Sequence, residues 1–147
     1  NVESYLGKDV MDKLDKEPDI PRVVVHNNKT KQYLILYFHP GGVINEFSEF
    51  EITPSFESNR QNIISIEDTA FTTESGVKLT MALVNFKLIK GEPDSLISED
   101  QEVICHYEIS NMNKSAFLKK YNMPLYYADY YFRNGYLYKF RFGFMYP

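Results

Sequence analysis

The fold of this chain is decided by a run near its C-terminal end, Tyr131-Phe132-Arg133-Asn134-Gly135-Tyr136-Leu137-Tyr138. Its central Asn-Gly pair is typical of a two-residue type I′ turn, in which both central residues need a positive φ. The residues on either side are rich in the aromatic types that strands favour. The run therefore predicts a β-hairpin in which Arg133 pairs with Tyr136, and this pair sets the register of both strands.

That register predicts which side chains share a face of the hairpin. If neither strand contains a bulge, one face carries phenylalanines that we expect in the core, namely Phe140, Phe142 and Phe144. The other face carries aromatic and basic side chains, namely Tyr126, Tyr130, Phe132, Lys139 and Arg141. A bulge in either strand would exchange the two faces locally.

A similar run lies closer to the N-terminus, Tyr37-Phe38-His39-Pro40-Gly41-Gly42-Val43-Ile44. Its Pro-Gly pair favours a type II turn or part of a four-residue loop, so we expect a second hairpin here. Pairing across this turn, with Phe38 opposite Val43, divides the preceding strand between two faces. Leu34, Leu36 and Phe38 then face the core, and Tyr33 and Tyr37 face away from it.

Each hairpin follows a helical pattern that ends at a Glu-Pro-Asp tripeptide, at residues 17–19 and 92–94. Apolar residues recur at helical spacing in both copies, as Leu6, Val10 and Leu14 and then as Met81, Val84 and Leu88. In the second copy, Thr80 is a candidate N-cap and Gly91 lies where a helix commonly ends. Further strands are expected at Arg22–His26 and Val103–Ile109, and a helical turn around Ser115–Lys119.

These elements predict a single α+β domain over residues 1–147. It consists of two tandem helix-plus-β-meander repeats that share one curved antiparallel sheet, with the helices packed on one face. We place the first repeat at about residues 3–52, the connector at 53–62 and the second repeat at about 63–147. Each repeat alone is small for an independent sheet, which favours a shared one.

The sheet face opposite the core is the candidate binding surface. Apolar burial stabilises by about 25 cal/mol per Å², so uncovered aromatic rings on that face forgo burial that a partner would supply. The proposed contact residues are Tyr33, Tyr37, Tyr126, Tyr130, Phe132, Lys139 and Arg141. The alternative is that Tyr-Lys and Tyr-Arg cross-strand pairs stabilise an open sheet face without any partner.

Composition excludes several classes of protein. The chain has 147 residues, a net charge of −4, twelve Tyr, eleven Phe and no Trp. Nucleic-acid binding normally requires a basic surface, so we expect no nucleic-acid partner. One Cys rules out an internal disulfide and a zinc site built on several cysteines. Apolar runs such as Tyr33–Phe38 are far shorter than the ~20 residues that span a bilayer.

Candidate catalytic residues are few. Cys105 and His106 are adjacent, but neighbours in a strand point to opposite faces and cannot act as a pair. The three histidines, at positions 26, 39 and 106, lack the spacing of a metal site. Glu46, Glu49 and Glu51 could supply an acid and a base, although carboxylates along a strand more often solvate a face. We expect no catalytic residues, no metal and no cofactor.

Residues Phe71–Pro147 resemble a module of exported proteins. The resemblance rests on the lead-in Ser75-Gly76-Val77-Lys78-Leu79-Thr80-Met81, on Lys90-Gly91-Glu92-Pro93, and on the meander that closes on the hairpin quoted above. This pattern is similar to the repeat of the β-lactamase-inhibitor-protein-like fold, shared with small outer-membrane lipoproteins that assist β-barrel assembly. The resemblance implies two repeats on one curved sheet, helices on its convex side and a concave side free to bind.

We therefore expect a non-enzymatic, exported module that binds a protein or peptide. The periplasm or the outer membrane is its expected location, and the chain begins at Asn1, as a processed protein would. Membrane association is expected only through a possible lipid anchor upstream of Asn1. Two alternatives stay open: a structural or assembly lipoprotein of the cell envelope, and a small-ligand binder or enzyme that uses the sheet concavity.

Overall fold

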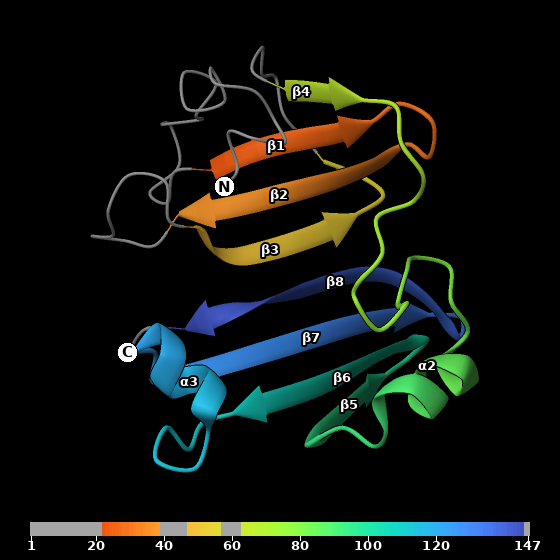
Figure 1. Cartoon of the computed structure of the whole chain (residues 1–147). Coiled ribbons are helices and arrows are strands. Elements are labelled where there is room, and N and C mark those ends of the chain that lie inside the picture. The colour runs from red at the N-terminus through yellow and green to blue at the C-terminus, as the bar shows by residue number, and fades with distance from the viewer. Residues whose placement is uncertain (1–21, 39–46, 57–62, 146–147) are drawn as a thin grey trace. The chain divides into compact units, whose positions relative to one another are not determined.

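The computed structural model describes residues 22–38, 47–56 and 63–145, which form a mixed α+β protein made mostly of strands (Figure 1). The predicted α+β class is confirmed. The chain divides into two compact units, Asn1–Ala70 and Phe71–Pro147. The helix expected around Leu6–Leu14 and the turn at Pro40-Gly41 lie outside the described residues, so the tandem repeat and the shared sheet stay predictions.

The first unit contains four described strands in the order β4-β1-β2-β3. They are β1 (Arg22–Asn27), β2 (Gln32–Phe38), β3 (Phe47–Thr53) and β4 (Ile63–Ile66). The pairs β1/β2 and β2/β3 are antiparallel, whereas β4 pairs with β1 in parallel. The strand β4 therefore belongs to the first unit, whereas the sequence pattern predicts that the second repeat begins at about residue 63.

The side chain of Asn27, the last residue of β1, makes hydrogen bonds to two neighbouring segments. The side chain is fully buried, and its amide nitrogen donates to the carbonyls of Asp68 and Thr69 at 3.1 and 2.9 Å. Its amide oxygen accepts from the backbone N–H groups of Lys29 and Thr30 in the turn toward β2. A buried amide must find partners for both of its ends, and here it ties the β1–β2 turn to the segment after β4.

The register between β2 and β3 differs from the prediction. Phe38 lies opposite Phe47, with ring centroids 4.4 Å apart, and Tyr37 lies opposite Glu49. The expected pairing of Phe38 with Val43 is therefore wrong. The partner of Phe38 lies farther along the chain than a tight turn at Pro40-Gly41 would allow, and the contact between the two rings stabilises this register.

The second unit contains four antiparallel strands in the order β8-β7-β6-β5 and two helices. Its elements are α2 (Leu83–Lys90), β5 (Ser95–Glu99), β6 (Glu102–Ile109), α3 (Ala116–Tyr121), β7 (Leu125–Arg133) and β8 (Tyr136–Met145). Asn134 and Gly135 have φ values of 51° and 80°, which confirms the predicted turn between β7 and β8.

The two helices were predicted with different success. The turn around Ser115–Lys119 is confirmed as α3, whose N-cap Ser115 accepts the N–H of Leu118 through its hydroxyl. The end of α2 at Gly91 is also as predicted. The predicted buried face of α2 is wrong, because Val84 and Leu88 are 67% and 82% exposed whereas Phe86 is fully buried.

The start of α2 explains why Phe86, rather than Val84 and Leu88, faces the sheet. The N–H of Leu83 donates to the carbonyl of Gly135, and Ala82 forms a bridge with Tyr136, so the first turn of the helix is attached to the β7–β8 hairpin. Attachment at this point turns Phe86, one helical turn later, toward the sheet. The cap is Ala82 rather than the expected Thr80.

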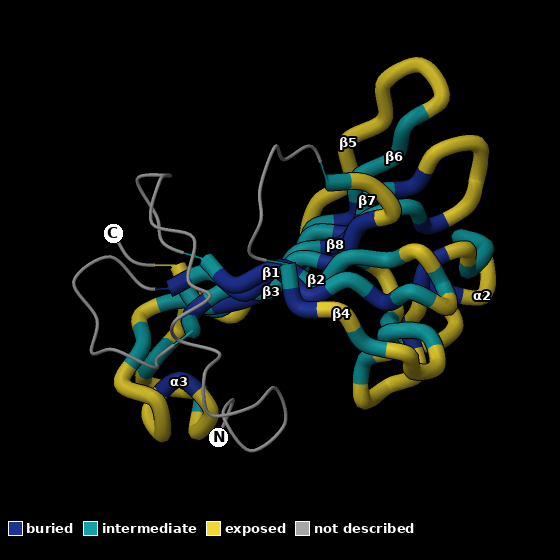
Figure 2. The backbone as a smooth tube through the Cα atoms, turned by 90° about the horizontal axis from the view of Figure 1, so that it is seen from above, coloured by how far each residue is buried: buried dark blue, intermediate teal, exposed yellow. Residues whose placement is uncertain are grey.

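A β-bulge in β8 decides the faces of the second sheet. Phe132 pairs with Leu137, but Tyr131 pairs with Lys139, so Tyr138 is an extra residue in the ladder. Beyond the bulge, each β8 side chain moves to the face opposite the one that an uninterrupted register predicts. Phe140 therefore lies opposite Tyr130, on the same face, and Figure 2 shows buried residues along these strands.

Candidate binding face

The aromatic face of the second sheet is its core, not a binding surface. Phe86 lies 4.6 Å from Tyr130 and 5.0 Å from Phe132, measured between ring centroids. Tyr130 is 3% exposed, and Phe132 and Phe140 are fully buried. Burial raises the pKa of the Tyr130 hydroxyl above its ordinary value. The expectation that Tyr130 and Phe132 face outward is therefore wrong, and the bulge is the reason.

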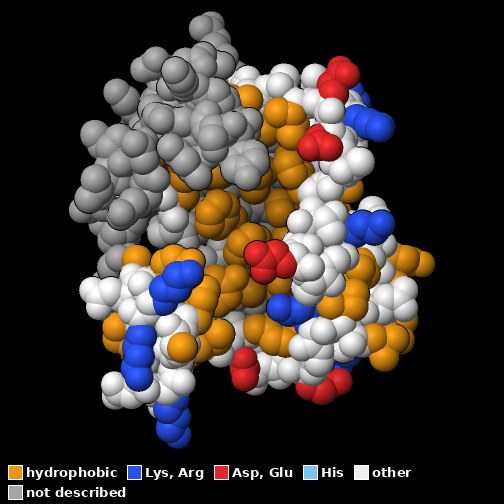
Figure 3. All heavy atoms as spheres, in the orientation of Figure 1, with side chains coloured by type: hydrophobic (Ala, Val, Ile, Leu, Met, Phe, Trp, Pro, Cys, Tyr) orange, Lys and Arg blue, Asp and Glu red, His pale blue; other side chains and the backbone are white. Residues whose placement is uncertain are grey.

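Tyr126 lies on the same face but at its other end, beside α3. Its ring is 5.2 Å from Phe117 and 5.5 Å from Phe144, and burial raises the pKa of its hydroxyl. Figure 3 shows this face of the second unit, on which hydrophobic side chains gather between α3 and α2. Tyr126 is half-buried among aromatic neighbours, so the expected outward position of this residue is also wrong.

The opposite side of the second sheet is open except at Tyr127, which is buried. We define this open face by His106, Asp129, Tyr131, Arg133, Tyr138, Lys139 and Arg141. Lys139 lies opposite Tyr131, and Arg141 lies opposite Asp129, which in turn lies opposite His106. The bulge thus separates Lys139 and Arg141 from Tyr130 and Phe132, with which the sequence analysis grouped them. Both described helices make their aromatic contacts on the other side of the sheet.

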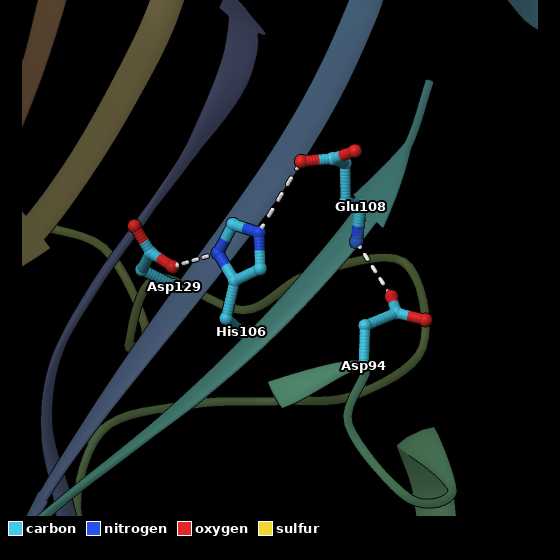
Figure 4. Close-up of polar contacts among 4 residues, drawn as sticks. All are labelled: Asp94, His106, Glu108 and Asp129. Carbon is cyan, nitrogen blue, oxygen red and sulfur yellow. Dashed lines mark hydrogen bonds and ion pairs between the residues drawn. The ribbon is translucent and has the colours of Figure 1, made fainter. Parts of the chain in front are cut away.

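A polar row crosses the open face from β6 to β7 (Figure 4). His106 Nδ1 lies 2.6 Å from Asp129 Oδ1, and His106 Nε2 lies 3.6 Å from Glu108 Oε2. Partial burial alone would lower the pKa of His106, but hydrogen bonding and charge attraction to Asp129 and Glu108 raise it above 6.5. Asp94 accepts the backbone N–H of Glu108 at 2.8 Å and fastens the start of β5 to β6.

Two cation–aromatic pairs lie beside that row. Lys139 Nζ sits 4.2 Å from the ring centroid of Tyr131, and the guanidinium of Arg133 sits 4.4 Å from that of Tyr138. The Tyr138 hydroxyl donates to the carboxylate of Glu102, which also lies 3.6 Å from Arg133. A cation held over a ring orders both side chains while part of each stays in contact with water.

Tyr33 and Tyr37 belong to the first unit and share a face of its sheet. Tyr33 stacks on His26 with centroids 4.5 Å apart, and the Tyr37 hydroxyl donates to Glu51 at 3.3 Å. Both tyrosines are half-buried. Of the seven predicted contact residues, the structure therefore leaves Lys139 and Arg141 together on the open face of the second unit.

The open face does not assemble a nucleophile with its base. The ring nitrogens of His106 face two carboxylates, and Cys105, which is fully buried, lies on the other side of β6 as predicted. Burial raises the pKa of the Cys105 thiol, which disfavours the reactive thiolate. Across the described part of the chain, no group of three or more His, Cys, Asp or Glu side chains could hold a metal ion.

Sequence reasoning missed Asp129, His106 and Tyr131 as members of one surface. The alternation within β7 indicates that Asp129 and Tyr131 share a face, but their neighbours come from pairing with β6 and β8. That pairing depends on a loop and on a bulge, which carry no strong local signal.

Among the described helices, none is long and apolar enough to cross a membrane.

Comparison of the chain with protein-family models, with curated proteins and with solved structures finds no match. The resemblance to the β-lactamase-inhibitor-protein-like fold therefore stays a prediction. What the structure defines is the class, an α+β protein whose sheets are antiparallel apart from the β1/β4 pair.

Proposed function

We propose that this chain is a non-catalytic module that binds a protein or peptide on the open face of its second unit. The observation that carries the proposal is the pair of cation–aromatic contacts on that face, Lys139 with Tyr131 and Arg133 with Tyr138. Tyr and Arg are the residues that most often dominate binding at protein interfaces. Each of these side chains already contacts a partner on the same face, which lowers the conformational entropy that it loses on binding.

The charges of the open face support a partner that is itself polar. Cations lie along β8 at Lys139 and Arg141, and carboxylates lie along β6 at Glu102 and Glu108. A partner with acidic groups toward β8 and basic groups toward β6 complements this arrangement. Such complementarity contributes mainly to orientation and to the rate of association.

Export and the tandem-repeat architecture form part of the same proposal. The motifs of residues 71–147 support them through their resemblance to the exported module described above. A role in envelope assembly is the neighbouring alternative. The gene sequence upstream of Asn1 distinguishes an exported binding module from an envelope-assembly protein. A lipidated cysteine there favours the envelope role, and an ordinary cleavage site favours free export.

Site-specific photo-crosslinking tests the binding face. The photoreactive residue p-benzoylphenylalanine replaces Tyr131 on the open face or, as a matched control, Leu88, which is exposed on α2. In extract of the source organism, we expect position 131 to yield a discrete adduct that position 88 does not. In the same protein, Arg141→Glu should reduce the adduct several-fold with circular dichroism unchanged. An adduct equal at both positions, or one unaffected by Arg141→Glu, overturns the proposal.

A further inference from the structure

The outermost strand of the second sheet, β5, is the least covered element of the described chain. All five of its residues, Ser-Leu-Ile-Ser-Glu from Ser95 to Glu99, are exposed (Figure 2). Its hydrophobic side chains are included, since Leu96 is 47% and Ile97 is 52% exposed. Of the described strands, only β6 pairs with it.

The hairpin register shows which backbone groups of β5 are turned outward. Glu99 pairs with Glu102 across a two-residue turn, and the pair that flanks such a turn is hydrogen-bonded. Hydrogen-bonded and non-hydrogen-bonded pairs then alternate along an antiparallel ladder. Ile97 therefore bonds to β6, whereas the N–H and C=O groups of Leu96 and Ser98 point away from it.

The strand lacks several of the devices that commonly protect a sheet edge, and Glu99 is its one charged residue. It contains no Pro and no Lys, and its register with β6 runs without a bulge from Ser95 to Glu99. Proteins usually use such residues or a local twist to prevent the addition of another strand. The edge of β5 is thus a regular template for an incoming backbone.

Charge selects the kind of segment that fits this edge. Exposed carboxylates lie at both ends of the strand, because Asp94 precedes it, Glu99 is its last residue and Asp100 follows it. Glu92 is farther from the strand and pairs with Lys87. A second copy paired antiparallel about Ile97 would bring Glu99 of one chain near Asp94 of the other. Like charges at that distance disfavour self-pairing, whereas lysines or arginines at the ends of an incoming strand would be attracted.

We propose that β5 binds an extended peptide segment, apolar in its middle and basic at its ends, as an additional antiparallel strand. The backbone of the segment bonds to Leu96 and Ser98, and its apolar side chains lie beside Leu96 and Ile97. Strand addition of this kind draws affinity from main-chain hydrogen bonds and specificity from alternate side chains. The site is distinct from the open face and does not depend on the function proposed there.

The probe is a seven-residue peptide, acetylated and amidated, that alternates Val and Thr between two terminal lysines. Its binding to the ¹⁵N-labelled full chain is followed by amide shifts and by hydrogen exchange. We expect the amides of Leu96 and Ser98 to become protected, with those of Ile97 and Ile104 little changed. The same peptide with terminal glutamates should bind about tenfold more weakly at low salt.

Two variants test whether the peptide binds by strand addition rather than in another way. Ser98→Pro removes an outward N–H that the β5/β6 ladder does not use, and it should abolish binding while the β6 and β7 amide shifts persist. The double variant Glu99→Gln with Asp100→Asn removes the charges at one end without adding a Lys to the edge, and it should reduce the preference for the lysine peptide. Tyr121→Ser, at an exposed position on α3, is the control and should leave peptide binding unchanged.

Three results would overturn the proposal. One is peptide binding that survives Ser98→Pro in the folded protein. Another is an equal affinity for the lysine and glutamate peptides. The third is protection of Leu96 and Ser98 that appears without peptide and rises with protein concentration, together with a dimer in sedimentation velocity, because the occupant of the edge would then be a second copy.

Discussion

Tyr130 on β7 lies directly opposite Phe140 on β8, and their rings stack with centroids 5.6 Å apart at an interplanar angle of 26°. An uninterrupted register from the Asn134-Gly135 turn would have placed them on opposite faces of the sheet. The bulge at Tyr138 brings them together, and Phe86 of α2 packs on Tyr130. The main aromatic cluster of the second unit, and with it the identity of the open face, therefore depends on one extra residue.

Deletion of Tyr138 tests that role of the bulge. Without this residue, Lys139 follows Leu137 in a regular ladder and every other side chain keeps its face, so we expect the fold to survive with a loss of about 1–2 kcal/mol. Deletion of Arg141, a regularly paired residue, moves Phe142 and Phe144 to the open face and should destabilise far more. Urea unfolding compares the two variants. Equal losses of unfolding free energy would contradict the role of Tyr138 as the extra residue of the bulge.

Phe86 is predicted to be the main link between α2 and the sheet. Phe86→Ala removes a fully buried ring that contacts Tyr130 and Phe132, so it should cost about 3–5 kcal/mol of unfolding free energy. Leu88→Ala, at an exposed position on the same helix, should change it by no more than about 0.5 kcal/mol. Urea unfolding measures the free energy of both variants. A larger loss from Leu88→Ala than from Phe86→Ala would show that Leu88 lies on the buried face of the helix, as the sequence predicts.

His106 and Asp129 should make stability depend on pH. The pKa of His106 is raised in the folded protein, so its charged form is favoured there relative to the unfolded chain. The stabilisation is complete below the ordinary His pKa of about 6.5 and is lost as pH rises through the higher folded value. Wild type should therefore exceed His106→Gln in stability by more at pH ~5 than at pH ~9.

NMR titration supplies the second readout for this pair. The imidazole signals of His106 should titrate at higher pH in wild type than in Asp129→Asn, because the variant loses the charged partner at Nδ1. An unchanged midpoint in Asp129→Asn would show that the contact in Figure 4 does not control the proton.

Asn27 should be important for the first unit although its neighbours are ordinary turn residues. Asn27→Ala leaves the carbonyls of Asp68 and Thr69 and two turn N–H groups without their partner, which should cost about 1–3 kcal/mol. Asn28→Ala, next in the chain and half-buried, is the matched control and should have a smaller effect. Chemical denaturation followed by circular dichroism compares them, and equal losses would contradict the bridging role.

Local sequence signals predicted several elements of the second unit well. Asn134-Gly135 indicated its turn, Gly91 the end of α2, and Ser115 the start of α3, because each of these residues acts on the backbone within a few positions of itself. The prediction that Cys105 and His106 face opposite ways is also confirmed, since alternation is a property of any strand.

The candidate site was harder to predict, because its members come together across strands. Lys139 and Arg141 were proposed as contact residues but were grouped with buried rings, which lie on the opposite face. His106 and Asp129, which are 23 positions apart, meet only because β6 and β7 pair in one particular register. No residue in either strand signals its partner, so a sequence alone could not single out the pair.

The sequence by itself determined the Asn134-Gly135 turn, the end of α2 at Gly91 and the alternation of side chains, since these follow from the φ preferences of Asn and Gly and from strand geometry. Only the tertiary structure decided which face of the second sheet is buried. Tyr130, Phe132 and Phe140 share one face, where Phe86 packs on Tyr130 and Phe132, and this arrangement buries a large apolar area. The favourable free energy of that burial exceeds the cost of leaving one residue, Tyr138, out of the regular ladder.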